Sequence, residues 1–294
     1  MSPDHSGIAE VIEKATGLQI HSCKTLKSFG NHVVEVNDEW IFRFPIGRPS
    51  ADRTQKQLNF LAAFAKRSPL AIPEPVFITG DFVGYRKIGG EPFFPGNPFD
   101  ATEIDRLPAE DKKRIAKQVG VFLATLHDYR DNTIDWETGW FAGKREGGEP
   151  SDAQCFVNYL SAGEYRRLVA KREAIENNPA NFVQPATIIH NDLYFLNILW
   201  DRTSRTITGI LDWSEMGLGI PALDFIGIAD FATSRNDQFL RDIVRWYGAG
   251  DTLFNQIKEN AIIEVMNWFW FYEHTNDPEG AARTITRLKN ILNT

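Results

Sequence analysis

The distribution of apolar residues changes character near residue 90, and this change limits the possible folds more than any other feature. Before it, short apolar runs alternate with turn residues such as Gly and Asn, a pattern typical of β-strands and hairpins. After it, apolar residues recur mostly every three or four positions, which indicates helices. We therefore predict an α+β, bilobal protein, with an N-terminal antiparallel sheet lobe over 1–90 and a larger, mainly helical C-terminal lobe over 91–294.

The elements of the first lobe follow from these patterns. A helix over 51–66 places Leu58, Leu61, Ala62 and Ala65 on one face, because they are spaced i, i+3, i+4 and i+7. A shorter helix is expected before the sheet. This short helix covers 8–15. Strands are predicted at 19–27, 32–37, 40–44, 75–79 and 82–88.

The second lobe begins after a stretch over 89–100 that is rich in Pro, Gly and Phe, which we interpret as the connection between the lobes. A long amphipathic helix is then predicted over 109–127. Further helices are predicted at 161–176, 221–232, 236–247, 251–273 and 279–292. Short apolar strands interrupt them at 187–190, 197–200 and 206–211.

Composition and charge exclude several classes of protein. The chain has 294 residues, 43% of them hydrophobic, which suffices for a substantial core. It contains no apolar run of roughly 18 residues that could span a membrane, and its first residues lack the pattern of a signal peptide. The net charge of −7 argues against nucleic acid as a partner and favours a cationic ligand. We expect a cytoplasmic monomer that binds a small molecule and neither nucleic acid nor membrane.

The two cysteines, Cys23 and Cys155, lie far apart in the sequence. They cannot build a disulfide framework or a metal knuckle, and a reducing compartment such as the cytoplasm fits them. Free cysteine is usually buried, so we expect both to be small core residues.

The most informative segment is 190–197, which reads His-Asn-Asp-Leu-Tyr-Phe-Leu-Asn. Phosphoryl transfer requires a carboxylate that orients and deprotonates the attacking hydroxyl, and Mg²⁺ held by oxygen ligands. A loop that carries Asp192 and, five positions later, Asn197 can supply the carboxylate and one ligand. Asp212 ends an apolar strand further along, and it can face the same cleft as a second ligand.

Each of these residues has a simpler interpretation when taken alone. A single Asp in a loop is usually a turn or cap residue, and a single His is more often structural than catalytic. We accept that interpretation for His190, which we expect to support the loop. The joint pattern is different, because Asp192, Asn197 and Asp212 all lie beside apolar runs of the β type. Their combination predicts phosphoryl transfer.

The segment 190–225 resembles the aminoglycoside phosphotransferase and choline kinase family, a branch of the protein-kinase-like fold. The similar sequences are Asp-Trp-Ser-Glu at 212–215 and Gly-Ile-Pro-Ala-Leu-Asp-Phe at 219–225. Three segments of the first lobe look like the aminoglycoside 2″-phosphotransferase branch. They are 40–45 (Trp-Ile-Phe-Arg-Phe-Pro), 72–76 (Ile-Pro-Glu-Pro-Val) and 86–91 (Arg-Lys-Ile-Gly-Gly-Glu).

This resemblance implies a nucleotide lobe over 1–90 and a catalytic and substrate lobe over 91–294. It implies Asp192 as the catalytic base, with Asn197 and Asp212 as Mg²⁺ ligands. ATP or GTP would be the phosphoryl donor. The backbone around 88–91, including Ile88 and Gly90, would hold the purine, and Gly30 would lie in the loop that covers the phosphates.

The chain departs from the family at the phosphate clamp. The family usually has a lysine on the third strand, paired with a helix glutamate, to hold the α- and β-phosphates. Arg43 and Gln57 stand at these two positions. Arginine keeps a permanent charge and its own fork of donors, and glutamine can accept one of its hydrogen bonds. We predict that Arg43 and Gln57 hold the phosphates together; the alternative for Arg43 is a surface charge with a buried stem.

Candidates for acceptor binding lie on the later helices. Aminoglycosides are polycations with many hydroxyls, so their pockets require carboxylates and flat apolar walls. The helix 251–273 carries Glu264, Trp268 and Phe271 on one face, and Asp230 on an earlier helix can face the cleft. We predict that these four residues, with Asp192, contact the acceptor. The alternative is that the aromatic rings are core and the acids are solvated.

An aminoglycoside antibiotic is the favoured acceptor, which would make the protein a resistance enzyme. The sequence at 212–215 also resembles that of hygromycin and macrolide phosphotransferases. Hygromycin, a macrolide, or a metabolic alcohol or amino sugar is therefore an alternative acceptor. The changes at Arg43 and Gln57 leave open a nucleotide-binding pseudokinase. A metal-dependent phosphohydrolase is the least favoured, because the pattern lacks the His and Asp cluster that such sites need.

Overall fold

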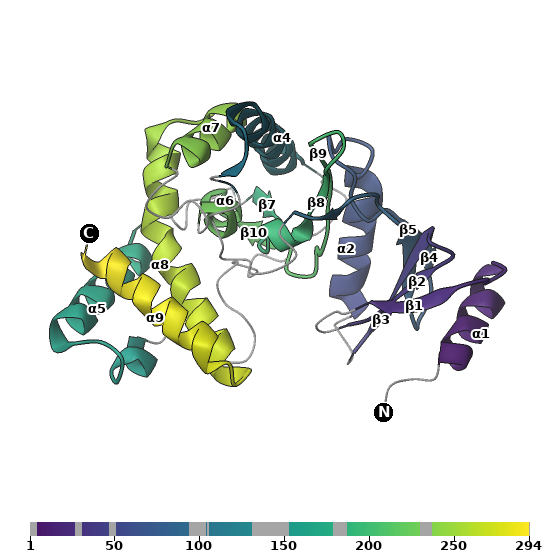
Figure 1. Ribbon diagram of the computed structural model, residues 1–294, viewed down its shortest axis with the longest axis horizontal. Helices are drawn as coiled ribbons and strands as arrows, with labels where there is room; N and C mark the ends of the chain where they lie inside the picture. The colour runs from purple at the N-terminus through teal and green to yellow at the C-terminus, as the bar shows by residue number, and fades with distance from the viewer. Residues whose placement is uncertain are drawn as a thin grey trace. The chain divides into compact units, whose positions relative to one another are not determined.

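The computed structural model describes residues 5–26, 31–46, 51–93, 104, 106–130, 153–178, 187–229 and 237–293. Their contacts divide into two compact units, whose helices and strands are labelled in Figure 1. The first unit comprises the described residues within Met1–Phe93, with Arg130 and Ile198–Ser214. The second comprises those within Phe94–Tyr129, Trp136–Asn197 and Glu215–Thr294. The predicted division at residue 90 stays a prediction.

Antiparallel strands form the main sheet of the first unit: β1 (Cys23–Leu26), β2 (Asn31–Val36), β3 (Trp40–Pro45), β4 (Pro75–Ile78) and β5 (Val83–Arg86). Their order in the sheet is β1-β2-β3-β5-β4. Asn37 and Asp38 make the turn between β2 and β3 with positive φ angles of 55° and 57°, which these residue types tolerate better than most. The register pairs Val34 with Phe42, and both side chains are fully buried.

The first unit also contains α1 (His5–Thr16) and α2 (Ala51–Phe64). Helix α1 lies beside β1 (Figure 1) and packs Ile8 and Ile12 into a core with residues of β2 and β3. Helix α2 buries Leu58 and Leu61, as its apolar stripe predicted, and it buries Phe60 as well. Both helices therefore use an apolar face, and both predicted helices are confirmed.

A smaller sheet of the first unit has the order β6-β8-β9, formed by β6 (Glu91–Pro92), β8 (Ile198–Asp201) and β9 (Thr206–Ile210). The hairpin β8–β9 is held to the segment before β4 by backbone hydrogen bonds: Ala71 N–H donates to Thr208 O (3.2 Å), and Ile210 N–H donates to Ala71 O (2.9 Å). Gly209 makes this approach possible, because a Cβ there would lie 2.8 Å from Ala71 O. The hairpin belongs to the first unit although it comes late in the sequence.

The second unit is mainly helical and contains α4 (Ala109–Asp128), α5 (Ala162–Glu176), α6 (Ala222–Ala229), α7 (Asp237–Tyr247), α8 (Asp251–His274) and α9 (Pro278–Asn293). Helix α5 begins with a capping box formed by Ser161 and Glu164. Helix α4 packs closely on α7 at Gly120, where a Cβ would lie 2.6 Å from Ile243 O. Apolar residues of α5, α8 and α9 form a common core.

Two short strands of the second unit, β7 (Thr187–Ile189) and β10 (Gly217–Gly219), pair in antiparallel fashion. The predicted α+β class, with an N-terminal antiparallel sheet and a helical C-terminal part, is confirmed. The predicted strands and helices lie within a few residues of the observed ones. Strands β6 and β10 escaped prediction because they have two and three residues and contain Pro and Gly, which carry no strand pattern.

The cysteines depart from expectation. Cys23 is half-buried, and Cys155 is exposed, so the prediction of two core cysteines was wrong for Cys155. It lies in the short helix η1 (Ala153–Phe156), which turns Ala153 and Phe156 inward instead.

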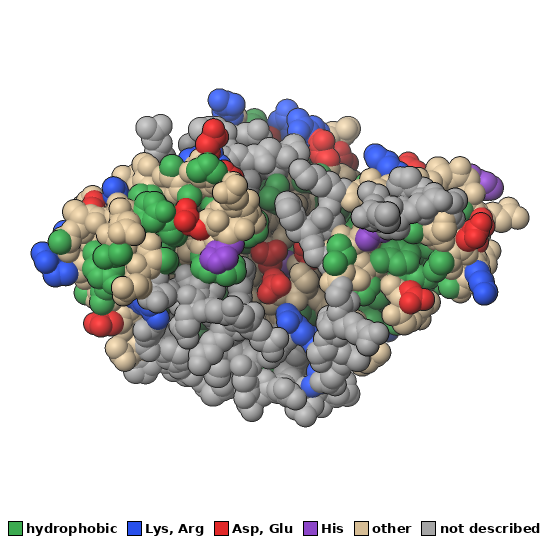
Figure 2. Space-filling model, turned by 90° about the horizontal axis from the view of Figure 1, so that it is seen from below, with side chains coloured by type: hydrophobic (Ala, Val, Ile, Leu, Met, Phe, Trp, Pro, Cys, Tyr) green, Lys and Arg blue, Asp and Glu red, His purple; other side chains and the backbone are tan. Residues whose placement is uncertain are grey.

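The surface and the helices add two observations. On the face shown in Figure 2, acidic and basic side chains are interspersed rather than separated by sign. Of the helices in the described ranges, none combines the length and the apolar character that a bilayer crossing requires.

Candidate active site

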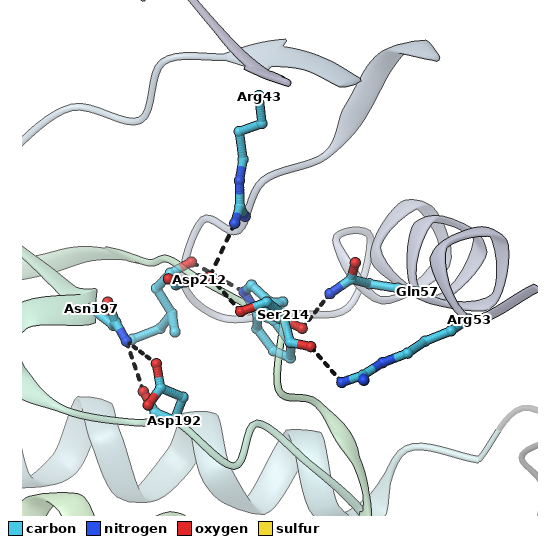
Figure 3. A network of polar contacts seen from close by, with 9 residues as sticks. Arg43, Arg53, Gln57, Asp192, Asn197, Asp212 and Ser214 are labelled. Carbon is cyan, nitrogen blue, oxygen red and sulfur yellow. Dashed lines mark hydrogen bonds and ion pairs between the residues drawn. The ribbon is translucent and has the colours of Figure 1, made fainter. Parts of the chain in front are cut away.

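The loop between β7 and β8 carries the two residues predicted as base and metal ligand. The Nδ2 atom of Asn197 donates to the backbone O of Asp192 (2.8 Å) and to its Oδ2 (2.9 Å), as Figure 3 shows. This double contact fixes the orientation of the Asp192 carboxylate. It also turns the amide oxygen of Asn197, the atom that can bind a cation, to the other side of the amide group.

His190 supports this loop from inside. Its side chain is fully buried, and its Nδ1 accepts a hydrogen bond from the backbone N–H of Asp192 (3.3 Å). The next residue, Asn191, adopts a positive φ of 62°, a conformation that asparagine reaches more readily than most residues. The expected structural role of His190 is confirmed.

A fully buried carboxylate on α6, that of Asp224, holds the same loop by its backbone. Its Oδ1 accepts from the N–H of Asn191 (2.6 Å), and its Oδ2 accepts from the N–H of His190 (2.8 Å) and from Nε2 of His127 (3.0 Å). A buried carboxylate is tolerated when several donors surround it. These contacts therefore fix the conformation of the loop just before Asp192.

His127 connects this network to other elements of the second unit. Its Nδ1 lies 3.1 Å from the hydroxyl of Tyr247 at the end of α7, and its backbone O accepts from the hydroxyl of Thr187 in β7 (2.5 Å). Sequence reasoning assigned no role to His127 or to Asp224. The available signal was an acidic residue inside the otherwise apolar run of α6, since a charge in such a place needs partners.

Helix α6 also approaches the loop closely through a glycine. A Cβ at Gly227 would lie 2.5 Å from the backbone O of Leu193 and 3.1 Å from the ring of Tyr194. No side chain larger than hydrogen fits there without displacing the loop. Asp224 and Gly227, one turn apart on α6, thus support consecutive parts of the loop.

The first unit contributes Asp212, which follows β9 and adopts a positive φ of 55°. Its Oδ1 accepts from NH2 of Arg43 (3.2 Å) and from the hydroxyl of Ser214 (2.9 Å) (Figure 3). A non-glycine residue in this conformation costs about 1–3 kcal/mol and persists where its surroundings enforce it. The carboxylate is thus held in a defined orientation just after the strand.

Arg43 lies in β3 and also interacts with Tyr85 of β5. Burial raises the pKa of the Tyr85 phenol above its ordinary value, and the neighbouring Arg43 guanidinium opposes this shift. The phenol is therefore neutral at physiological pH. Arg43 thus lies between a neutral phenol and the carboxylate of Asp212.

The expected pairing of Arg43 with Gln57 is not found among the described contacts. The amide nitrogen of Gln57 donates instead to the backbone O of Trp213. NH2 of Arg53, one turn earlier on α2, donates to the backbone O of Ser214 (2.9 Å). Figure 3 shows both side chains directed at the backbone that follows Asp212. The family resemblance could not indicate these contacts, because they join side chains to backbone atoms.

The segment predicted to hold the purine lies along the hairpin β8–β9 in the first unit. The hydroxyl of Thr208 donates to Gly89 O (2.6 Å). Gly90 has a φ of 110°, and a Cβ there would lie 2.5 Å from Thr208 Oγ1. Ile88 contacts the same hairpin, because its Cγ2 lies 2.7 Å from where a Cβ of Gly209 would stand. The backbone of this segment is therefore fixed locally.

Of the residues predicted to bind the acceptor, Trp268 has a contact with the loop. Its Nε1 donates to the hydroxyl of Tyr194 (3.0 Å), and the two rings meet edge to face with centroids 5.4 Å apart. Phe271 packs against Trp268 with ring centroids 5.4 Å apart, and Glu264 is half-buried on the same helix, α8. The predicted Gly30 and Asp230 lie outside the described residues.

The donor atoms fit Mg²⁺ better than a transition metal. Within the described ranges, no group of three or more His, Cys, Asp or Glu side chains could hold a metal ion. The candidates are the amide oxygen of Asn197 and the carboxylate of Asp212, which are the hard oxygen ligands that Mg²⁺ prefers. Asn197 belongs to the second unit and Asp212 to the first.

The family follows from a comparison with known families. Residues 22–257 match the model of the phosphotransferase enzyme family. The match spans well over half of the chain, so the chain belongs to this family, and the predicted enzyme class, a phosphotransferase, is confirmed. No curated protein has significant sequence similarity to it.

Solved structures share the fold at low sequence identity. The GDP complex of wild-type aminoglycoside 2'-phosphotransferase-IIIa is 20% identical with a TM-score of 0.76, covering 98% of each chain. The gentamicin complex of APH(2")-IIa is 19% identical with a TM-score of 0.68, covering 98% of this chain and 97% of that one. Macrolide 2'-phosphotransferase MphH from Brachybacterium faecium is 16% identical with a TM-score of 0.66, covering 97% of each. The predicted kinase-like fold is thereby confirmed.

Proposed function

We propose that the protein transfers the γ-phosphoryl group of ATP or GTP to a hydroxyl of a small molecule, an aminoglycoside antibiotic in the first place. The observation that carries this proposal is the double hydrogen bond from Asn197 to Asp192. It presents a carboxylate and an amide oxygen from one short loop, which is the pair of groups that phosphoryl transfer uses to orient a hydroxyl and to bind Mg²⁺.

In this proposal Asp192 accepts the proton of the acceptor hydroxyl. Asn197 Oδ1 and the carboxylate of Asp212 would hold Mg²⁺, which would offset charge on the triphosphate. Asn197 belongs to the second unit and Asp212 to the first. Because the chemistry is mostly positioning, the rigid support of Asp192 by His190 and Asp224 serves it directly.

The nucleotide would be bound by the first unit. Arg43 places its guanidinium beside Asp212 (3.2 Å), where it can also reach phosphate oxygens. Ile88 and Gly90 belong to a backbone segment that is pinned to β8–β9 and can present its peptide groups to a purine. Gly30 lies outside the described residues, and we propose it as part of the loop that covers the phosphates.

The acceptor would be bound by the second unit. Trp268 contacts Tyr194, which lies two residues after Asp192, so the aromatic face of α8 adjoins the loop that carries the base. Phe271 and Glu264 extend this face, and Asp230 is a further candidate. The net charge of −7 favours a polycation. Gentamicin is bound in a solved structure of the same fold, so an aminoglycoside is the natural first choice of acceptor.

A macrolide is the second candidate. The aromatic contacts among Tyr194, Trp268 and Phe271 form an apolar surface, and a macrolide requires such a surface more than it requires charge. The fold is also shared with a macrolide 2'-phosphotransferase. We place either activity in the cytoplasm, where ATP, GTP and free cysteines occur together.

The experiment is a product assay by mass spectrometry. The protein is incubated with Mg²⁺, ATP or GTP, and a panel of aminoglycosides, macrolides, amino sugars and choline-like alcohols. We expect a mass gain of one phosphate group on an aminoglycoside, and a far slower gain with the Asp192→Asn variant. If only another member of the panel is phosphorylated, the protein is a kinase for that class of substrate instead. Nucleotide binding without any product would replace the proposal by a pseudokinase.

A further inference from the structure

One face of α2 is directed at the two residues that follow Asp212. Arg53 and Gln57 are spaced i, i+4 and share this face. NH2 of Arg53 donates to the backbone O of Ser214 (2.9 Å), and the amide nitrogen of Gln57 donates to the backbone O of Trp213. Two successive carbonyl groups after Asp212 are therefore held by side chains of one helix (Figure 3).

The same face continues with apolar contacts to Trp213. Phe60 and Phe64, at the next two positions of the stripe, lie with ring centroids 5.7 Å and 6.0 Å from the indole. Trp213 is 1% exposed, and its Nε1 donates to the backbone O of Ile210 (3.3 Å). The residue after Asp212 is thus locked by its ring as well as by its carbonyl group.

These contacts directly follow Asp212, which adopts a left-handed φ of 55°. Aspartate reaches this conformation more readily than most residues but still prefers others, so contacts that hold the following peptide groups help to keep the carboxylate in one direction. The contacts of Gln57 and Arg53 restrain the peptide groups directly after Asp212. The hydroxyl of Ser214 then reaches back to Oδ1 (2.9 Å), which fixes the side chain as well.

We propose that Gln57 and Arg53 are positioning residues for the metal-binding carboxylate. They hold the backbone of Trp213 and Ser214 so that Asp212 meets Mg²⁺ in one orientation. The proposal rests on the proposed function, and it gives Gln57 a different task from the phosphate clamp expected at its position. Arg43 takes its anchor from Asp212 itself, so α2 acts on the nucleotide site through the backbone after that residue.

The decisive variant is Gln57→Glu, which keeps the shape of the side chain but replaces the N–H donor by an oxygen that repels the carbonyl of Trp213. Losing one such hydrogen bond corresponds to about a fivefold change in an equilibrium. We expect the Mg²⁺ concentration for half-maximal nucleotide binding to rise about fivefold or more. Arg53→Met should act in the same direction, and Arg53→Lys, which keeps a cationic donor, should stay closer to wild type.

A matched control lies on the same helix. Gln55 is exposed and donates to Asn59 Oδ1 (2.9 Å), so Gln55→Glu makes the same chemical change away from the contact face. Its Mg²⁺ dependence should equal that of wild type. Thermal unfolding of each variant shows whether it is folded, and Arg53→Met serves as the test if Gln57→Glu is not.

The measurement is binding of a fluorescent ATP analogue during a Mg²⁺ titration, together with kcat and KM where an acceptor is known. A shift in Mg²⁺ dependence for Gln57→Glu and Arg53→Met, absent in Gln55→Glu, supports the proposal. An unchanged Mg²⁺ dependence overturns it. So does an equal loss of nucleotide affinity with and without Mg²⁺, which would assign Gln57 to the phosphates. If the wild-type protein shows no Mg²⁺-dependent nucleotide binding, the proposed function itself fails.

Discussion

At the scale of single residues, the proposed function gives separate tasks to the nitrogen and the oxygen of the Asn197 amide group. Its nitrogen fixes the carboxylate of Asp192 through two hydrogen bonds, and its oxygen points the other way, where a cation can bind. Aspartate at this position could not donate to Asp192, and the like charges would repel. In the proposed function, the amide therefore lets Asp192 as the base and a metal ligand share one short loop.

The first prediction concerns the base. Asp192→Asn removes the proton acceptor but keeps the size of the side chain, so kcat should fall roughly 10²- to 10⁴-fold. Nucleotide affinity should stay within about twofold, because the nucleotide contacts are assigned to other residues. Steady-state kinetics and nucleotide titration measure the two quantities. Retained kcat, or a parallel loss of nucleotide affinity, would contradict the assignment of Asp192.

The second prediction concerns the guanidinium of Arg43. Arg43→Ala should raise the KM for the nucleotide about tenfold or more, because a charge-assisted hydrogen bond to phosphate is lost. The KM for the acceptor should change little. Arg241→Ala is the control, since Arg241 pairs with Asp251 at an exposed place on α7. Unchanged nucleotide kinetics in Arg43→Ala would refute its contact with the phosphates.

At the scale of elements, helix α6 supports the loop that carries Asp192. It does so through the carboxylate of Asp224 and through the absence of a side chain at Gly227. Asp224 binds the N–H groups of His190 and Asn191, and Gly227 admits the carbonyl of Leu193. The loop therefore has little freedom to move Asp192 relative to α6. This rigidity is useful because a small displacement of a catalytic group is costly in rate.

The third prediction tests this support. Gly227→Ala places a Cβ 2.5 Å from Leu193 O, so the free energy of unfolding should fall by about 1–3 kcal/mol and kcat should fall with it. Gly163→Ala on α5 is the control, because its Cβ would meet its nearest neighbour, Arg167, at an ordinary 3.7 Å. Thermal unfolding and kcat are compared for both. Equal behaviour of the two variants would show that α6 does not constrain the loop.

The elements also show what the sequence could and could not predict. Amphipathic helices such as α2 and α4 were predictable because their apolar residues repeat with the helical period. Strand β10 was not, since its sequence is Gly-Leu-Gly and its pairing with β7 depends on the surrounding fold. Cys155 was misplaced because burial of a cysteine is a tendency of its residue type, whereas the turn of η1 decides which side chains face inward.

The candidate site divides in the same way. Asp192, Asn197 and Asp212 could be proposed from their spacing and their flanking apolar runs, because phosphoryl transfer needs such oxygen-bearing groups. The partners of Gln57 and Arg53 could not be found, since backbone carbonyl groups are present at every position and leave no mark in the sequence. The roles of His127 and Asp224 depend on contacts between residues 97 positions apart, which spacing cannot reveal.

At the scale of the whole molecule, the fold is far better preserved than the sequence. The three related structures have TM-scores of 0.66 to 0.76 with identities of 16% to 20%. Acceptors with different chemistry, an aminoglycoside and a macrolide, are thus served by one architecture. The class of reaction therefore rests on the family match, since a fold alone does not determine function. The acceptor must be identified by the product assay.

The most direct measurement is a crystal structure of the protein with Mg²⁺ and a non-hydrolysable ATP or GTP analogue, repeated with Mn²⁺ to locate the ion by anomalous scattering. We predict one divalent ion at about 2.0–2.2 Å from both Asn197 Oδ1 and a carboxylate oxygen of Asp212, with the carboxylate of Asp192 facing the γ-phosphate. An ion bound without either residue, or a nucleotide remote from Asp192, would contradict the proposed phosphoryl transfer.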